Sequence, residues 1–179
     1  MDALTRMALD ARHGGKDALR GLVAGCYDQV WRLCAALVDE QSADDLAQET
    51  FVRAVGALPG FGARASARTW VLAIARNTCM DELRRRGRRR RRQAALQLSA
   101  GSSATLPDAS QGPVVADLLG RLEPERRTAF VLTQVLGLRY EEAATVCACP
   151  VGTIRSRVAR ARADLLELLA PSGAAAEVE

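Results

Sequence analysis

Apolar side chains recur at spacings of three and four residues through the first third of the chain, and this pattern predicts amphipathic helices. The first such segment runs from Asp17 to Val38. It is long enough for two helices, and Gly25 marks a break between them. The stripe expected to face the core consists of Leu19, Leu22, Val23, Cys26, Val30, Leu33, Cys34 and Leu37.

The next periodic segment, SADDLAQETFVRAVGALPG, predicts a helix that Pro59 and Gly60 end. Ser42 is the expected N-cap, with Asp45 three residues later in a capping-box arrangement. A helical projection separates an inner face from an outer face that carries acidic and amide groups. The inner face is Ala47, Phe51, Ala54 and Leu58, and the outer face is Asp45, Gln48, Glu49 and Val52.

A loop over residues 59–66 then leads to a helix in which Trp70, Val71, Ile74 and Thr78 line one side. That helix runs into an arginine cluster. Four more helical segments follow Pro113, with Pro124 suited to a first helical turn and Gly137 to a helix end. We therefore expect an all-α fold of two small helical domains, residues 1–92 and 114–170, with a flexible linker over 93–113 and a disordered tail over 171–179.

The composition supports helices: 49% of the residues are hydrophobic, but only 4% are aromatic. No apolar run approaches the roughly 20 residues of a membrane span. The N-terminal residues also lack the uninterrupted apolar stretch of a secretion signal. These features predict a cytoplasmic protein with no membrane partner.

The positive charge is concentrated in one place. The net charge is +4, and eight arginines lie between Arg84 and Arg92. Without them, residues 1–92 carry nine basic and eleven acidic side chains. Such a run favours contact with a polyanion over a uniformly basic surface.

The sequence near the C-terminus predicts a helix-turn-helix. A short helix over 140–147 and a longer one from Pro150 are joined by about three residues. The longer helix is expected to bury Ile154, Val158, Ala161, Leu165, Leu168 and Leu169. Its opposite face has small residues, which allow close approach to another surface. Arginines flank these small residues and can donate hydrogen bonds to phosphates and base edges. A recognition helix in the DNA major groove is therefore favoured over a helical hairpin with a basic face.

The five cysteines form no CxxC pair and are odd in number, which argues against a disulfide framework or a zinc site. Cys147 and Cys149 leave open a redox or metal sensor. The sequence also lacks a Ser/His/Asp set and a phosphate-binding loop, so we expect no enzyme activity, cofactor or metal. A stand-alone helix-turn-helix regulator is the other alternative.

Three blocks, DDLAQETFVRA, FGARASARTWVLAIARNTCMDELRR and GLRYEEAATVCACPVGTIRSRVARAR, resemble the extracytoplasmic-function (ECF, group IV) sigma factors of the sigma-70 family. The excess of arginine (24) over lysine (one) resembles an actinobacterial, sigma-C-like subgroup. The resemblance implies a sigma-2 domain over 1–92 and a sigma-4 domain over 114–170. It also implies a subunit that directs RNA polymerase to −35 and −10 promoter elements and stabilises melted DNA.

The same resemblance implies three sets of site residues. Those that bind the β′ clamp helices of core polymerase are Asp44, Asp45, Gln48 and Glu49. The −10 set is Phe61, Arg76, Asn77, Arg84, Arg85 and Arg88, and the −35 set is Thr153, Arg155, Ser156, Arg157, Ala159 and Arg160. The polymerase β flap, promoter DNA and an anti-sigma factor are the implied partners. Arg139 stands where the family commonly has Ser or Thr, so that N-cap is expected to be lost.

Overall fold

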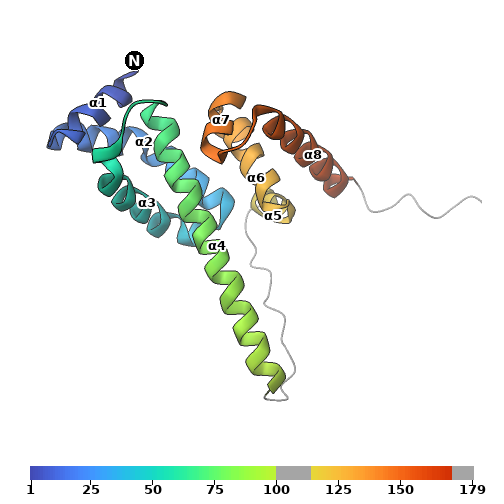
Figure 1. Ribbon diagram of the computed structural model, residues 1–179. Helices are drawn as coiled ribbons and strands as arrows, with labels where there is room; N and C mark the ends of the chain where they lie inside the picture. The colour runs from blue at the N-terminus through green and yellow to red at the C-terminus, as the bar shows by residue number, and fades with distance from the viewer. Residues whose placement is uncertain (100–113, 171–179) are drawn as a thin grey trace, which may run out of the picture.

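The computed structural model describes residues 1–99 and 114–170, and all regular elements in these ranges are helical (Figure 1). The first half contains α1 (Ala3–Arg12), α2 (Lys16–Leu37), η1 (Glu40–Ser42), α3 (Ala43–Ala57), η2 (Leu58–Gly60) and α4 (Ala67–Ser99). The second contains α5 (Val114–Arg121), α6 (Pro124–Phe130), η3 (Val131–Val135), α7 (Tyr140–Cys147) and α8 (Val151–Leu169). The predicted all-α class with two helical parts is confirmed. Residues 100–113 of the predicted linker and the predicted tail lie outside the described residues.

Helix α1 is not predicted by the sequence pattern, and it explains Gly25. The Asp2 carboxylate caps α1 by accepting from the Thr5 backbone N–H at 2.9 Å. Helix α1 lies so close to α2 that a Cβ atom at Gly25 would stand 2.5 Å from Cδ2 of Leu4. The glycine therefore marks a close helix crossing, and the break predicted there is wrong because α2 continues through it.

The start of α3 also differs from the prediction. Ser42 makes no side-chain cap, so the predicted capping box with Asp45 is wrong. Instead, the short helix η1 precedes α3, and Asp39 accepts a hydrogen bond from the Ser42 N–H at 2.7 Å. The Ser42 hydroxyl, which was expected to cap α3, instead accepts a hydrogen bond from Nη2 of Arg86 at 2.6 Å. Arg86 is distant from Ser42 in sequence.

Arg86 fastens α4 to the corner between α2 and α3. Its guanidinium lies 2.5 Å from Asp39 and 2.8 Å from Glu82. Partial burial opposes the charge on Asp39, but the hydrogen bonds from Arg86 and Ser42 outweigh it and lower the Asp39 pKa below its ordinary value. One member of the arginine run therefore stabilises the fold.

This contact should make stability pH-dependent. A carboxyl whose pKa is lowered by folding stabilises the chain above its unfolded-state pKa, near 3.8, and loses that contribution as pH falls through the folded value. We expect Asp39→Asn to lower the free energy of unfolding at pH 7, and to flatten its decline between pH 6 and 3. Urea unfolding across that range measures both effects. The exposed Asp10→Asn is the control, and equal slopes for both variants would contradict the prediction.

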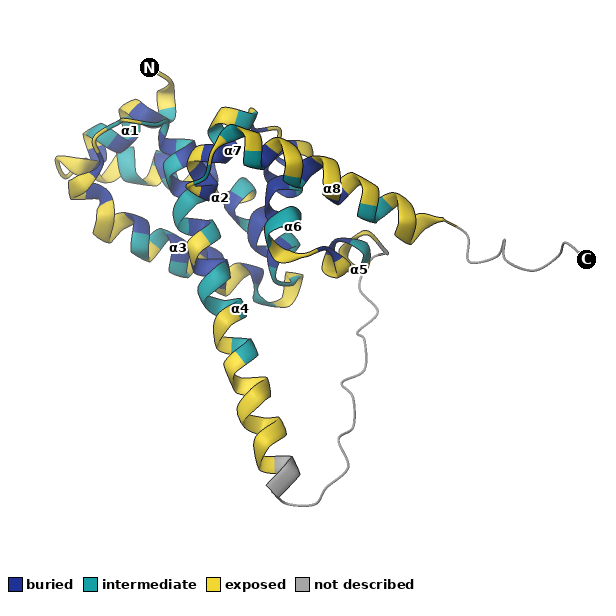
Figure 2. Cartoon of the chain, turned by 45° about the vertical axis from the view of Figure 1, so that its right-hand side comes forward, coloured by how far each residue is buried: buried dark blue, intermediate teal, exposed yellow. Residues whose placement is uncertain are grey.

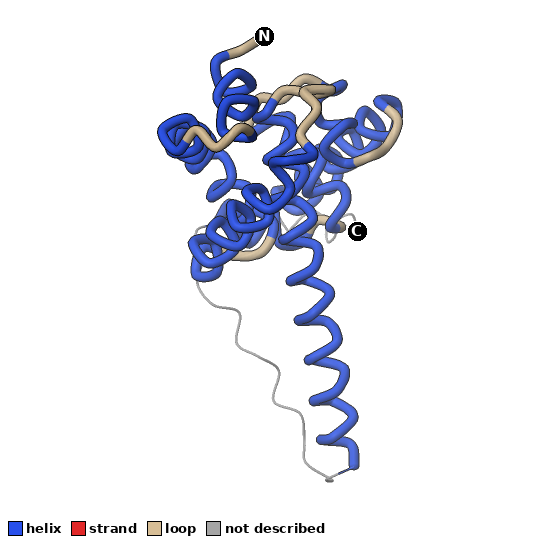
Figure 3. The backbone as a smooth tube through the Cα atoms, turned by 60° about the vertical axis from the view of Figure 1, so that its left-hand side comes forward, coloured by secondary structure: helices blue, strands red, loops and turns tan. Residues whose placement is uncertain are grey.

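Helix α4 extends well beyond the folded body. Its 33 residues span about 50 Å, and its C-terminal part projects away from the other helices (Figures 2 and 3). The residues from Arg88 to Leu96 are all exposed. The helix continues to Ser99 and so includes the first seven residues of the predicted linker. The arginine run therefore lies on a helical rod.

The two halves share a single hydrophobic core, and two arginines of the interface bond to backbone carbonyls. Arg68 of α4 donates to Gln29 at 2.6 Å and to the carbonyl of Leu136 at 2.7 Å. Arg127 of α6 donates to the carbonyl of Leu37 at 3.1 Å and also to the carbonyl of Gly120. Burial lowers the pKa of Arg127. These bonds join α2 and α4 to the second half.

We expect Arg127→Ala to lower the free energy of unfolding by about 1.5–3 kcal/mol, because a charged donor and its bonds to several carbonyls are lost. Urea unfolding followed by far-UV circular dichroism measures this change. Arg121→Ala is the matched control, since Arg121 is exposed and pairs with Asp117 on its own helix. That control should change the free energy by less than about 1 kcal/mol. Similar losses in the two variants would refute a structural role for Arg127.

No helix in residues 1–99 or 114–170 is both long enough and apolar enough to cross a membrane.

Candidate nucleic-acid and polymerase interfaces

Helix α3 presents an acidic face, defined here as Asp44, Asp45, Gln48 and Glu49. Asp45 and Gln48 are exposed, as the helical projection predicts, and Asp44 beside them is also exposed, whereas Glu49 is half-buried. Asp44 accepts a hydrogen bond from the Tyr27 hydroxyl at 3.0 Å, which raises the Tyr27 pKa. Asp44 and Asp45 thus point away from the core.

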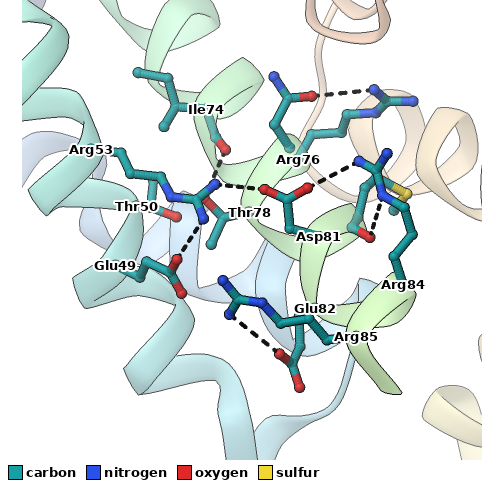
Figure 4. A network of polar contacts seen from close by, with 12 residues as sticks. Glu49, Thr50, Arg53, Ile74, Arg76, Thr78, Asp81, Glu82, Arg84 and Arg85 are labelled. Carbon is teal, nitrogen blue, oxygen red and sulfur yellow. Dashed lines mark hydrogen bonds and ion pairs between the residues drawn. The ribbon is translucent and has the colours of Figure 1, made fainter. Parts of the chain in front are cut away.

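Glu49 is more constrained than its three neighbours. Its carboxylate lies 2.5 Å from Arg53, whose other Nη atom lies 2.9 Å from Asp81 of α4 (Figure 4). The hydrogen bond from Arg53 lowers the Asp81 pKa. Through its contacts with Glu49 and Asp81, Arg53 connects α3 to α4. Next to the acidic face, Val52 is 73% exposed and Val55 45% exposed. Val55 is missing from the sequence prediction, although its spacing from Val52 places it on the same face.

Phe61 occupies a buried position in the loop before α4. It is only 3% exposed, and its ring centroid lies 4.9 Å from that of Trp70. Nη1 of Arg12 donates to the Phe61 carbonyl at 3.1 Å, so α1 holds the loop from behind. The predicted contact of this ring with −10 DNA does not fit the structure, because the ring belongs to the core that supports the loop.

The same loop contains a strained residue and lines a groove. Ala63 has a φ of +52°, which is uncommon for a residue with a side chain. A groove of about 350 Å³ is lined by Gly60–Ala65, Trp70 and neighbouring residues of α4, and Thr145 of α7. The second half therefore contributes to the surface beside the predicted −10 loop.

Arg76 and Asn77 lie together on α4 as predicted. Asn77 is exposed, and its Oδ1 accepts from Nη1 of Arg76 at 3.3 Å. Its amide nitrogen has no hydrogen-bond partner among the residues described. Arg76 also lies 4.0 Å from Glu125 of α6, and its Nε is buried without a hydrogen bond. Asn77 thus retains a free donor at the surface, whereas Arg76 is held near the second half.

The remaining arginines of the predicted −10 set differ in their freedom. Arg84 lies 3.1 Å from Asp81, and Arg85 lies 3.9 Å from Glu82. Arg88 is exposed and pairs with no acidic side chain in the described part of the chain. Positive charge is therefore increasingly unpaired toward the C-terminal end of α4.

Helices α7 and α8 form the predicted helix-turn-helix. Ala148, with a φ of +50°, ends α7, and Pro150 stands at the N-cap of α8. At the start of α7, the Arg139 N–H donates to the Glu142 carboxylate at 2.9 Å. That hydrogen bond lowers the Glu142 pKa. Glu142 thus caps the backbone N–H at the start of α7, and it also accepts from Nε of Arg139 at 3.4 Å.

The outward face of α8 is the one projected from the sequence. Arg155, Ser156, Ala159 and Arg160 are exposed, and Thr153 is half-buried. On the other side, Ile154, Val158 and Ala161 are buried. Leu168 and Leu169 instead are 37% and 62% exposed, because α8 extends beyond the helices that it packs against (Figure 1).

Arg157 does not share the outward face. It is half-buried, forms an ion pair with Glu125 of α6, and its Nη1 lies 3.7 Å from Sγ of Cys149. In this arrangement Arg157 fastens α8 to α6, so the structure separates it from the other predicted −35 residues.

The surroundings of Cys147 do not favour a reactive thiol. Cys147 is buried, and burial raises the pKa of its thiol to about 11, which disfavours the reactive thiolate. Within residues 1–99 and 114–170, no group of three or more His, Cys, Asp or Glu side chains is arranged to hold a metal ion. These observations give no support to the redox or metal alternative.

The chain matches two family models, one in each half of the structure. Sigma-70 region 2 matches residues 22–89, and Sigma-70, region 4 matches residues 114–165. Region 2 thus contains the acidic face and Asn77, and region 4 contains the helix-turn-helix. A match to two sigma-70 regions along one chain does not favour a stand-alone helix-turn-helix regulator.

Similar proteins carry sigma factor names. The chain is 47% identical over 167 residues to the probable RNA polymerase sigma-C factor of Mycobacterium bovis, covering 92% of this chain and 90% of the relative. It is equally similar to the ECF RNA polymerase sigma factor SigC of Mycobacterium tuberculosis. Among solved structures, CnrH in complex with the cytosolic domain of CnrY has a TM-score of 0.74 at 31% identity, covering 96% of this chain and all of that one. Together with the two matched families, these likenesses show that the chain belongs to the ECF sigma factors of the sigma-70 family and is a sigma-C-like RNA polymerase sigma factor.

Proposed function

We propose that the chain recruits core RNA polymerase through the acidic face of α3 and recognises −10 and −35 elements through α4 and α8. The observation that carries this proposal is the separation of charge: α3 displays exposed carboxylates, whereas α4 and α8 display arginines. Phosphates would repel the acidic face, so that face suits a protein partner. The β′ clamp helices are the proposed partner of α3, and the β flap that of the second half.

Asn77 is the proposed contact for a base extruded from the nontemplate strand. A base outside the helical stack exposes its pairing edge, and a side-chain amide both donates and accepts hydrogen bonds there. Arg84, Arg85 and Arg88 would hold neighbouring phosphates. Phe61 would act from within the core by holding the loop, and Arg76 would need to leave Glu125 to reach DNA.

For the −35 element, the proposed contacts are the exposed side chains of α8: Arg155, Ser156, Ala159 and Arg160, with Thr153 at the helix start. Small residues among the arginines allow the helix to sit deep in the major groove. Arg157 supports the helix from behind through its ion pair with Glu125.

We also propose that the protein is cytoplasmic, acts by binding and not by catalysis, and is regulated by an anti-sigma factor. Two solved relatives support the last point. One is CnrH bound to CnrY, and the other is RpoE bound to the anti-sigma factor NepR from Bartonella quintana, with a TM-score of 0.66 and 29% identity.

The test is transcription from a pool of genomic DNA fragments by bacterial core polymerase, with and without the purified chain. Transcripts that start at a common set of upstream sequences only when both proteins are present would support the proposal. If the chain instead binds discrete duplex sites tightly without core and adds no start sites with it, the proposal fails.

A further inference from the structure

We infer that helix α1 positions the −10 loop, defined here as residues 61–66, and that Thr5 is the residue through which α1 controls the base preference of this loop. The assignment of the loop to −10 DNA rests on the proposed function. Helix α1 precedes the residues that match Sigma-70 region 2, which begin at residue 22. It lies at the same end of the molecule as the start of α4 (Figure 1). Thr5 is only 4% exposed, so it acts on the loop without touching DNA, as a positioning residue.

The −10 loop is held at its ends and not along its length. Gly62–Ala65 form no hydrogen bond with any residue that the structure describes. Gly62 and Arg64 are exposed, and Ala63 between them has a φ of +52°. The position of the loop therefore depends on the contacts of Phe61 at one end and of the start of α4 at the other.

Helix α1 bonds to both ends. At the first end, Nη1 of Arg12 donates to the Phe61 carbonyl at 3.1 Å. At the second end, the Thr5 hydroxyl accepts from the backbone N–H of Ala67, the first residue of α4, at 2.9 Å. That N–H is one of those at a helix start that have no partner within the helix. One helix thus fixes where the loop begins and where it ends.

The hydrogen bonds of Thr5 make its hydroxyl specific for this task. The hydroxyl donates to the Asp2 carboxylate at 2.6 Å. Hydrogen bonds from Thr5 lower the Asp2 pKa, so this carboxylate is ionised at neutral pH and can only accept. The hydroxyl proton is therefore directed to Asp2, and an oxygen lone pair is left for the Ala67 N–H. Because Ala67 is fully buried, its N–H would be left without a partner if the hydroxyl were removed, unless the start of α4 moved.

The loop forms one wall of the surface that would receive an extruded base. The groove of about 350 Å³ beside it is also lined by Trp70 and Ala73 of α4. Asn77 lies four residues after Ala73 and therefore on the same face of the helix, so the groove and Asn77 are adjacent. A shift of the loop changes the width of this groove, and with it the difference in fit between one base and another.

The test compares wild type with Thr5→Val, which preserves the shape of the side chain but removes the hydroxyl, and with Thr5→Ser, which retains the hydroxyl. Thr128→Val is the matched control, because Thr128 is a buried threonine of α6 whose hydroxyl donates to the Pro124 carbonyl of its own helix at 2.8 Å. Hydrogen exchange of the full-length chain, without polymerase, measures the protection of the Ala67 amide. Binding of the chain with core polymerase to a promoter whose −10 region is unpaired, and to single-base replacements of that region, measures base preference.

In Thr5→Val, the Ala67 amide should exchange at least about tenfold faster, because it has lost its acceptor. The preference for one base in the unpaired region should fall about tenfold, which is within the range that a well-placed base contact contributes. Affinity for core polymerase should change by less than about twofold, because Thr5 makes no contact with the acidic face of α3. Thr5→Ser and Thr128→Val should match wild type in all three measurements.

An unchanged base preference in Thr5→Val would overturn the inference, and so would a Thr5→Ser variant that behaves like Thr5→Val. A loss of core affinity as large as the loss of base preference would also overturn it, because α1 would then stabilise the whole fold instead of placing the loop. Failure of the proposed function gives a different result, since wild type itself would show no base preference in the unpaired region. Faster exchange of the Ala67 amide in Thr5→Val would still support the positioning of the loop by α1, and unchanged exchange would overturn it.

Discussion

Asp45→Arg is expected to weaken binding to core RNA polymerase about 100-fold, which corresponds to about 2.7 kcal/mol. Asp45 is exposed in the centre of the acidic face and makes no ion pair with a described residue. A partner that fits this face must be basic, so an arginine there replaces attraction with repulsion, and like charges in an interface cost several kcal/mol. Fluorescence titration of labelled chain with core enzyme measures the dissociation constant.

Asp45 is a sharper choice than Glu49 for this experiment. Glu49 is bound to Arg53 and, through it, to Asp81, so its reversal would also disturb the packing of α3 on α4. Asp10→Arg on α1 makes the same charge change at an exposed position and should bind core normally. If Asp45→Arg binds as tightly as this control, α3 does not dock on core polymerase.

The second large effect is expected for Asn77→Ala, which should reduce open-complex formation about tenfold to a hundredfold. A side chain that pairs with a base edge through two hydrogen bonds contributes about 1–3 kcal/mol of discrimination. Asn77→Asp should be worse than alanine, because it removes the donor and places a negative charge near phosphates. Permanganate reactivity of thymines in the melted region measures opening.

Two further comparisons make the Asn77 experiment specific. Gln41→Ala removes an exposed amide on η1 and should open DNA normally. On a promoter whose −10 region is already unpaired, wild type should prefer one base at the extruded position, and Asn77→Ala should bind all four nearly equally. A base preference that survives in the alanine variant would exclude Asn77 as the contact.

Hydrophobic spacing predicted most of the helices because burial follows helical periodicity where the core is built from large side chains. Helix α1 was not predicted because its buried residues are Thr5, Ala8 and Ala11. These side chains are small or polar, so they do not form a hydrophobic periodic pattern in the sequence. The role of Gly25 could not be predicted without α1, since only the neighbouring helix distinguishes a close crossing from a break.

The outward face of α8 was predictable for the same reason, since a helix that buries Ile154 and Val158 must expose the opposite side. The half-buried position of Arg157 was not predictable, because it depends on the ion pair with Glu125 of another helix. Phe61 shows a similar limit: its place in a loop indicates exposure, whereas its contact with Trp70 depends on how the chain returns after η2. Partners across the fold decide such cases, and a helical projection contains no information about them.

The shared core of the two halves restricts how such proteins can be recombined. A chimera that joins residues 1–99 of this chain to the second half of a distant relative would keep each DNA-binding surface intact. It would nevertheless place an unrelated side chain opposite the Leu37 carbonyl that Arg127 contacts, and an unrelated backbone opposite Arg68. Exchanging promoter preference by swapping whole domains should therefore require these interface residues to be transplanted together with the recognition helix.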